Sequence, residues 1–255
     1  MNKKWLTTRR MAIIGVLGGI SIVLGLTPLG FIPIGPTRAT IMHIPVIIGA
    51  ILEGPIVGAI VGLIFGLFSI FQAVTNPTPI SFVFLNPLVS VLPRILIGVV
   101  SYYVYRGFSK IGKKGTLAVS GLMWLGAMAY LIKGWIELLK VGTAAALAFQ
   151  RLLLVLLVIL GVVVWRFASK NAAEIALTGV FGTLTNTLGV LTMIYLFYGR
   201  RFAETLGADP DTAGKMIISI GMTNGVPEMI VAMIVSTYVV LALIKNRGDA
   251  NGISH

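Results

Sequence analysis

The sequence contains no cysteine, and its only histidines are His43 and His255. Without cysteine the chain has no disulfide, no thiolate nucleophile and no cysteine-ligated metal. So few histidines also exclude most transition-metal sites. We therefore expect no metal centre and no cofactor.

Charged side chains are scarce as well. They make up 11% of the 255 residues, against about 25% in soluble proteins. Hydrophobic residues make up 57%, and apolar runs long enough to span a bilayer recur from end to end. The composition predicts an all-α integral membrane protein, with residues 1–255 forming one transmembrane domain in the lipid bilayer.

The few charges are mostly basic: 20 Lys and Arg against 8 Asp and Glu give a net charge of +12. On a soluble surface this excess would suggest nucleic-acid binding. Here the cations lie in short loops beside apolar runs, which is the pattern of cytoplasmic loops. The arrangement predicts a multi-pass protein in the cell membrane with both termini in the cytoplasm and no nucleic-acid partner.

The apolar pattern predicts eight membrane segments. They lie at about 11–26, 41–53, 55–74, 86–105, 117–139, 144–165, 172–198 and 216–244. The second is short for a full span, and Glu53-Gly54-Pro55 should be a turn after it. Prolines and glycines between residues 28 and 38 predict an irregular outer loop.

Arg94 lies inside one of these segments, directly after Pro93. An arginine at that depth costs several kcal/mol unless it meets a counter-charge, a carbonyl group or water. Polar residues on two other segments could provide such groups: Thr183 and Asn186 on one, and Asn224 and Glu228 on the last. Asn224 and Glu228 are four residues apart and therefore share a helix face.

Two interpretations of these polar residues remain open. Arg94 and Glu228 could form a buried ion pair with a purely structural role, or the polar residues could line a ligand cavity that opens outward. His43, Gln72 and Asn86 are weaker candidates for the same cavity, because a single polar group at a helix end is often only solvated.

Glycines recur at four-residue intervals in two of the segments. Gly58, Gly62 and Gly66 share one face, and Gly15 and Gly19 repeat the spacing in the first segment. Small residues at this interval let a neighbouring backbone approach closely. We expect packing within the chain at the first set, and either internal packing or a partner protein at the second.

Five blocks resemble the substrate-binding S component of energy-coupling factor (ECF) vitamin transporters. They are His43–Ala50, Gly54-Pro55 with the glycines that follow, Asn86–Arg94, Gly182–Thr187 and Thr223–Glu228. The resemblance implies a six-helix bundle, in which residues of about 117–165 have no counterpart and would form an inserted helical hairpin. The loops at about 28–38 and 75–85 would be gates over the site.

The resemblance also implies a function. Such a protein captures a small vitamin from outside and delivers it through a complex with a transmembrane coupling subunit and two ATPase subunits. It is not an enzyme. The family packs small residues of its first helix, usually Ala-x-x-x-Ala, against the coupling subunit, which would assign docking to Ala12, Gly15 and Gly19.

The ligand is expected to be an anion. Arg94, with amides at Asn186 and Asn224, would suit a carboxylate. The motifs most resemble the pantothenate group; folate is the nearest rival, and a neutral vitamin would fit if Glu228 neutralises Arg94. The competing function is a stand-alone, ion-coupled carrier of a small organic anion, but the sequence shows no internal repeat of the kind such carriers have.

Overall fold

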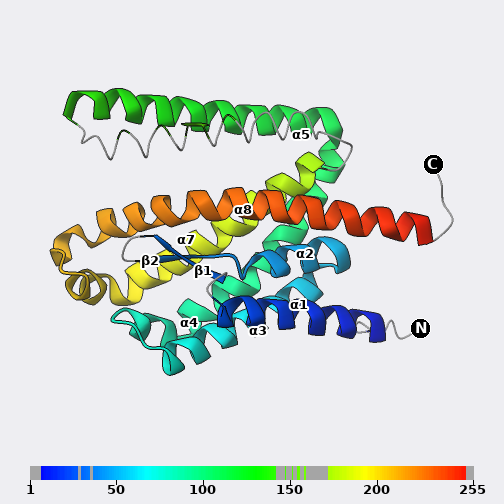
Figure 1. Cartoon of the computed structure of the whole chain (residues 1–255), viewed down its shortest axis with the longest axis horizontal. Coiled ribbons are helices and arrows are strands. Elements are labelled where there is room, and N and C mark those ends of the chain that lie inside the picture. Colours follow the sequence, from blue (N-terminus) through cyan, green and yellow to red (C-terminus); the bar gives the residue numbers. More distant parts are fainter. Residues whose placement is uncertain are drawn as a thin grey trace.

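The computed structural model describes residues 7–27, 30–34, 37–141 and 172–250, together with positions 147, 151, 154, 155 and 158. In this part of the chain, all regular structure is helical except for one two-stranded ribbon (Figure 1). Six of the described helical segments are long and apolar enough to cross a membrane. The expected all-α membrane bundle is confirmed.

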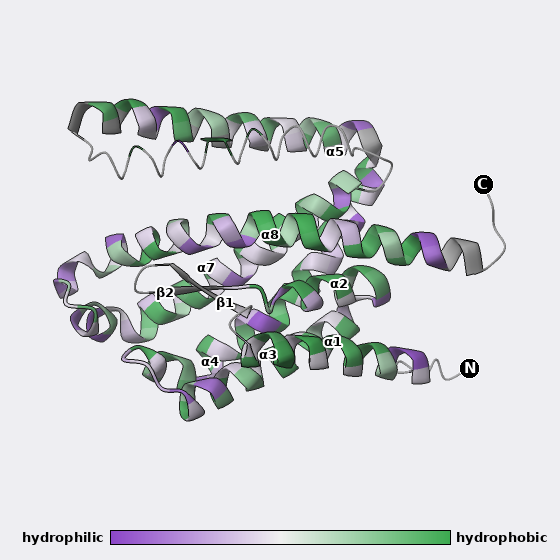
Figure 2. Cartoon of the chain, in the orientation of Figure 1, coloured by the Kyte–Doolittle hydropathy of each residue, from purple (hydrophilic) through white to green (hydrophobic). Residues whose placement is uncertain are grey.

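The six segments account for most of the predicted spans. They are Thr8–Leu26, Pro55–Thr75, Pro87–Gly112, Lys114–Ile136, Ala172–Thr205 and Pro210–Asn246. Figure 2 shows hydrophobic residues along all of these helices. The short segment expected at 41–53 is the ten-residue helix α2 (Ile44–Glu53). The span expected at about 144–165 lies outside the described residues, so the inserted hairpin stays a prediction.

Helices α1 (Thr8–Leu26), α2 and α3 (Pro55–Thr75) pack against one another. Gly54 joins α2 to α3 with a φ of 101°. Residues other than glycine rarely adopt this backbone conformation. Pro55 then begins α3 at a position where its missing N–H costs no hydrogen bond. The turn expected at Glu53-Gly54-Pro55 is therefore confirmed.

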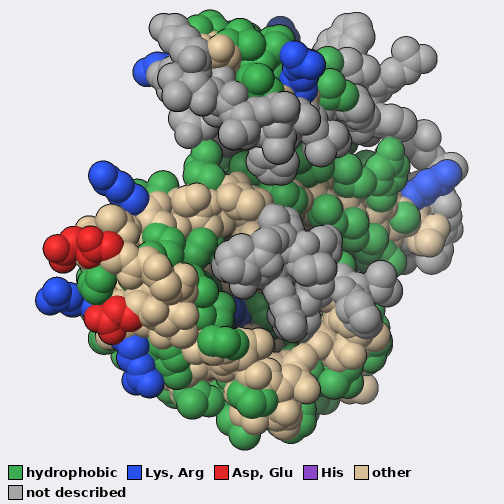
Figure 3. All heavy atoms as spheres, turned by 60° about the vertical axis from the view of Figure 1, so that its left-hand side comes forward, with side chains coloured by type: hydrophobic (Ala, Val, Ile, Leu, Met, Phe, Trp, Pro, Cys, Tyr) green, Lys and Arg blue, Asp and Glu red, His purple; other side chains and the backbone are tan. Residues whose placement is uncertain are grey.

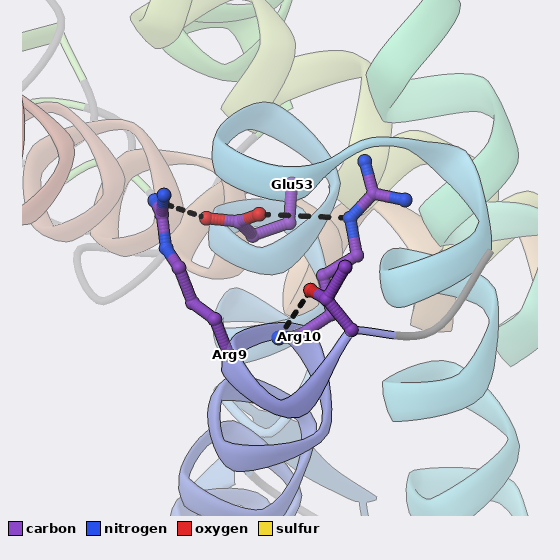
Figure 4. Close-up of polar contacts among 4 residues, drawn as sticks. Arg9, Arg10 and Glu53 are labelled. Carbon is purple, nitrogen blue, oxygen red and sulfur yellow. Dashed lines mark hydrogen bonds and ion pairs between the residues drawn. The ribbon is translucent and has the colours of Figure 1, made fainter. Parts of the chain in front are cut away.

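An acidic residue ties the end of α2 to the start of α1. Glu53 accepts a hydrogen bond from Arg9 at 2.9 Å and lies 3.8 Å from the Nε atom of Arg10 (Figure 4). The Glu53 side chain is 8% exposed, whereas that of Arg9 is 63% exposed. This cluster lies at the end of the bundle where α1 begins and α8 (Ala213–Ala250) ends (Figure 1).

The glycines of α3 face the backbone of α5 (Leu92–Val141) and of the turn before it. A Cβ atom built on Gly62 would lie 2.1 Å from the carbonyl oxygen of Arg94, and one on Gly66 would lie 2.7 Å from the Cα atom of Val91. A Cβ on Gly58 would lie 2.9 Å from the Cα atom of Gly98. The predicted internal packing of these three glycines is confirmed.

Helix α5 breaks at Gly112, which has a φ of 77° and a ψ of 173°. The first part packs within the bundle, and the part after Gly112 runs back beside it (Figure 1). Few residues of this second part are buried. This segment would be the first helix of the predicted hairpin, and it is attached to the bundle through the break at Gly112.

Helices α7 (Ala172–Thr205) and α8 complete the bundle, and α7 packs against both α5 and α8. The main hydrophobic core is contributed by α2, α3, α5, α7 and α8. Its fully buried members include Val46, Ile47, Val57, Val61, Ile97, Ile175, Ala232 and Val240. A second core joins α7 and α8 to the short helices before α5: the 3₁₀ turn η2 (Ser81–Leu85) and α4 (Pro87–Ser90).

The expectation of an irregular loop at 28–38 is wrong for its described part. Strands β1 (Phe31–Ile34) and β2 (Thr37–Thr40) form an antiparallel ribbon, with Phe31 opposite Thr40 and Ile34 opposite Thr37. Pro33 is tolerated because both strands of a two-stranded ribbon are edges. Of the prolines and glycines that suggested irregularity, Gly30 immediately precedes the ribbon and Pro33 lies within it.

Candidate functional site

Arg94 lies in the first turn of α5 and is 5% exposed. Its Nη1 atom donates a hydrogen bond of 2.7 Å to the carbonyl oxygen of Val89. In a continuous helix that carbonyl would accept from the backbone nitrogen four residues later, which belongs to Pro93 and carries no hydrogen. Pro93 therefore leaves an acceptor free one turn before Arg94, and the guanidinium takes it.

Two aromatic rings lie close to the guanidinium of Arg94. Its central carbon lies 5.2 Å from the ring centroid of Phe65 on α3 and 5.9 Å from that of Phe84 in η2. Aromatic faces attract cations but do not neutralise them. Among the described residues no carboxylate lies within 4 Å of Arg94. The positive charge is thus held without an ion-pair partner in that part of the chain.

Glu228 on α8 is 5% exposed and lies within electrostatic range of Arg94, but its carboxylate binds other groups. Oε1 accepts a 2.6 Å hydrogen bond from the backbone N–H of Thr40, at the end of β2. Oε2 accepts a 3.1 Å hydrogen bond from the hydroxyl of Thr187 on α7. The structural alternative of a direct Arg94–Glu228 ion pair therefore does not describe this geometry.

His43 and Thr183 meet next to this cluster, and both are fully buried. The Nε2 atom of His43 lies 2.9 Å from the hydroxyl of Thr183, which itself donates to the carbonyl oxygen of Gly179. Because the Thr183 hydroxyl has one hydrogen, His43 Nε2 is the donor. Arg94 also lies within electrostatic range of His43. This bond attaches the start of α2 to α7.

Two of the predicted amides are buried on the helices that carry these groups. Asn186 on α7 is 4% exposed and Asn224 on α8 is 8% exposed. Seven buried side-chain polar atoms have no hydrogen-bond partner among the described residues, and three of them belong to predicted site residues: Arg94 Nε, His43 Nδ1 and Asn186 Oδ1. Buried polar atoms are normally paired with protein or water, so unpaired atoms in one region indicate a place for a bound polar molecule.

Two other predicted site residues form hydrogen bonds outside this region. Asn86 caps α4 by accepting a hydrogen bond from the backbone N–H of Leu88, and it donates to the hydroxyl of Tyr198. Gln72 donates to the carbonyl oxygen of Gly25 and accepts from Asn76. The structure therefore brings Arg94, Glu228, His43 and Thr183 into one region and leaves these two with other partners.

Sequence reasoning missed several groups of this region. Phe65, Phe84 and the Val89 carbonyl surround Arg94, and the Thr40 N–H binds Glu228. Only Val89 had a signal in the sequence, because a proline four residues later always frees a carbonyl. A face of the molecule seen in Figure 3 is hollowed between its helices, with a basic side chain visible at depth.

The outer face of α1 carries the predicted docking residues. Ala12 and Gly15 are exposed, and a Cβ atom built on Gly15 or Gly19 would meet nothing within 4 Å. Gly18, on the adjoining side of the helix, packs against Ile64. The small residues at 15 and 19 are thus open to a neighbour rather than used for packing inside the described chain.

Residues 9–241 match the family described as the substrate-specific component of ECF transporters. The chain belongs to this family. Its members are binding components of transporters, so this S component is a multi-pass membrane protein and not an enzyme. The resemblance found in the five sequence blocks is confirmed.

Two relatives of this S component bear names that state a substrate. The pantothenic acid transporter PanT of Lactococcus lactis subsp. cremoris is 26% identical over 229 residues, which cover 84% of this chain and 82% of the relative. The pantothenate transporter PanT of Leuconostoc mesenteroides is 37% identical over 128 residues, covering 50% of this chain and 61% of the relative.

Proposed function

We propose that this S component captures pantothenate from outside the cell and delivers it inward through an ECF complex. The observation that carries the proposal is the buried, uncompensated charge of Arg94. It is buried, bound to one carbonyl and two aromatic rings, and has no carboxylate partner among the described residues. A ligand carboxylate on the guanidinium would supply the missing charge.

The other unpaired atoms fit the rest of such a ligand. Pantothenate carries hydroxyl groups and an amide besides its carboxylate, so it offers donors as well as acceptors. Asn186 Oδ1 needs a donor, and Arg94 Nε needs an acceptor. Asn186 and Asn224, on α7 and α8, would hold the uncharged part of the molecule while Arg94 holds the acidic end.

The orientation in the membrane follows from the charges at the two ends of the bundle. The end where α1 begins and α8 ends has the basic residues Arg9, Arg10, Arg106, Lys110, Lys114 and Lys245. The opposite end, seen obliquely in Figure 3, mixes acidic and basic side chains. The excess of basic residues favours the first end as cytoplasmic, with both termini inside.

The partners would be a coupling subunit and two ATPase subunits. The open face at Ala12, Gly15 and Gly19 on α1 is where the coupling subunit would pack, because small residues let another helix approach closely. ATP would be hydrolysed by the ATPase subunits alone, and this chain would contribute only binding and delivery.

Binding of pantothenate and of panthenol, its alcohol analogue, tests the proposal. The purified chain in nanodiscs is titrated with each compound by isothermal calorimetry. We expect tight binding of pantothenate and at least about a hundredfold weaker binding of panthenol, which lacks the charge that Arg94 needs. Equal binding of both compounds would refute the role of Arg94 as the anchor of a carboxylate. If folate binds and pantothenate does not, the proposed substrate is wrong.

A further inference from the structure

Among the contacts of the described residues, one carboxylate joins the β1–β2 ribbon to two helices. Glu228 accepts from the Thr40 backbone N–H at 2.6 Å with Oε1 and from the Thr187 hydroxyl at 3.1 Å with Oε2. These three residues are far apart in the sequence and belong to β2, α7 and α8. Hydrogen bonds to a charged acceptor are shorter and stronger than neutral ones, and this one is short.

The ribbon needs such an attachment. A two-stranded hairpin is marginally stable by itself, and its outward backbone groups have no strand to pair with. The Ile41 N–H closes the base of the ribbon on the carbonyl oxygen of Gly30, which joins the ribbon only to itself. β2 packs against α8, and Glu228 is the α8 side chain that takes a backbone donor from it.

The chain on the other side of Thr40 is fixed independently. The carbonyl oxygen of Met42 accepts a hydrogen bond from Ser21 on α1, and His43 donates to Thr183 on α7. Ser21, Met42 and His43 are all fully buried. The junction between ribbon and α2 therefore stays in place without Glu228, and the ribbon beyond Thr40 is the part whose position depends on the carboxylate.

We propose that Glu228 is a latch that holds the β1–β2 ribbon against α7 and α8 and sets how often the ribbon opens. Glu228 is a positioning residue in this assignment. The attachment itself does not depend on any ligand. Its consequence for ligand release rests on the proposed function, because the ribbon must then lie between the Arg94 region and the outside.

The absence of cysteine makes the latch directly measurable. Thr40→Cys keeps the backbone N–H that binds Glu228 and places the chain's only thiol at the partly buried end of β2, where a maleimide reports its accessibility in the full chain in nanodiscs without any vitamin. Adding Glu228→Ala should raise the labelling rate about tenfold or more, since hydrogen bonds to charged groups contribute more than neutral ones. Glu228→Gln keeps an acceptor for Thr40 and should restore most of the slow labelling.

Two threonines of α7 provide a matched pair. The hydroxyl of Thr187 binds Glu228, whereas the hydroxyl of Thr185 returns to the carbonyl oxygen of Phe181 in its own helix. Thr187→Ala should raise the labelling rate about threefold, as expected for one hydrogen bond, and Thr185→Ala should leave it unchanged. This pair decides the question even if Glu228→Ala does not fold.

These outcomes test the latch independently of the proposed substrate. Equal labelling in the Thr187 and Thr185 variants, or slow labelling in folded Glu228→Ala, overturns the latch even if pantothenate binds. Fast labelling in Glu228→Ala supports the latch even if pantothenate fails to bind the parent chain. With pantothenate bound, Glu228→Ala should release it faster than the parent chain does.

Discussion

Gly62 of α3 touches the backbone of Arg94: a Cβ atom built on it would lie 2.1 Å from the Arg94 carbonyl oxygen. A methyl group has no room there, because the obstacle is backbone and not the end of a flexible side chain. The close approach of α3 to α5 also brings Phe65, one residue before Gly66, to the guanidinium. One side of α3 therefore both packs against α5 and places an aromatic ring beside the guanidinium of Arg94.

Gly62→Ala should destabilise the fold. Overpacking a close contact costs typically about 1–3 kcal/mol, so the thermal unfolding temperature in detergent should fall clearly. Gly15→Ala is the control, because a Cβ at that position meets nothing within 4 Å. Equal unfolding temperatures for the two variants would contradict the described contact between α3 and α5.

Arg94→Ala should abolish capture of pantothenate while the chain still folds. The loss should be at least about a hundredfold in affinity, because a two-pronged bond to a carboxylate is removed. Arg94→Lys keeps the charge without the planar fork and should retain part of the affinity. Calorimetry of purified variants measures this, with Arg106→Ala as the control.

Arg106 suits that purpose because it belongs to the same helix. Its Nη1 atom donates to the hydroxyl of Tyr102 at an exposed position, three turns beyond Arg94. Arg106→Ala should bind pantothenate like the parent chain. Unchanged binding by Arg94→Ala would remove the central support for an anionic ligand.

Gly15→Leu should leave binding of pantothenate intact and stop its uptake. The leucine would fill the open face of α1 where the coupling subunit is proposed to pack. Uptake of labelled pantothenate by proteoliposomes that contain the whole ECF complex measures transport, and calorimetry of the S component alone measures binding.

Gly121→Leu is the matched control for docking, because Gly121 is equally open but lies on the α5 segment after Gly112. It should transport normally. If Gly121→Leu stops uptake and Gly15→Leu does not, the coupling subunit packs against that segment and not against α1.

Glu53→Gln should weaken the attachment of α1 to α2. The carboxylate is shared by Arg9 and Arg10, of which Arg9 is largely exposed, so we expect a loss of about 1 kcal/mol or less in stability. The difference in unfolding temperature between the parent and Glu53→Gln should shrink at high salt. A difference that does not change with salt would mean that the ion pairs are not its cause.

The helices were predictable because their signals are local. Spans of about 20 apolar residues follow from bilayer thickness, and the turn at Gly54 follows from a glycine before a proline. The packing of Gly58, Gly62 and Gly66 was predictable for the same reason, since a four-residue interval defines one helix face. Burial of Arg94 could also be inferred, because hydrocarbon surrounds its segment.

The partners of the polar groups were not predictable in this way. Glu228 was assigned to Arg94 or a ligand because both are charged, but it binds a backbone N–H at Thr40 that carries no sequence signal. Asn86 was predicted for the cavity, and the structure shows a cap of a four-residue helix that the prediction did not include. The ribbon was missed since its strands are short and contain Pro33, which in most contexts indicates a loop.

Gly112 separates two parts of α5 that should differ in how well they tolerate substitution. Before it, small residues such as Gly98 contact a neighbouring backbone, so their replacement disturbs the bundle. Beyond it, side chains such as Leu122 and Leu125 are largely exposed and answer mainly to lipid. Substitutions that keep this second part apolar should therefore be tolerated, whereas substitutions at the packed glycines of the first part should not.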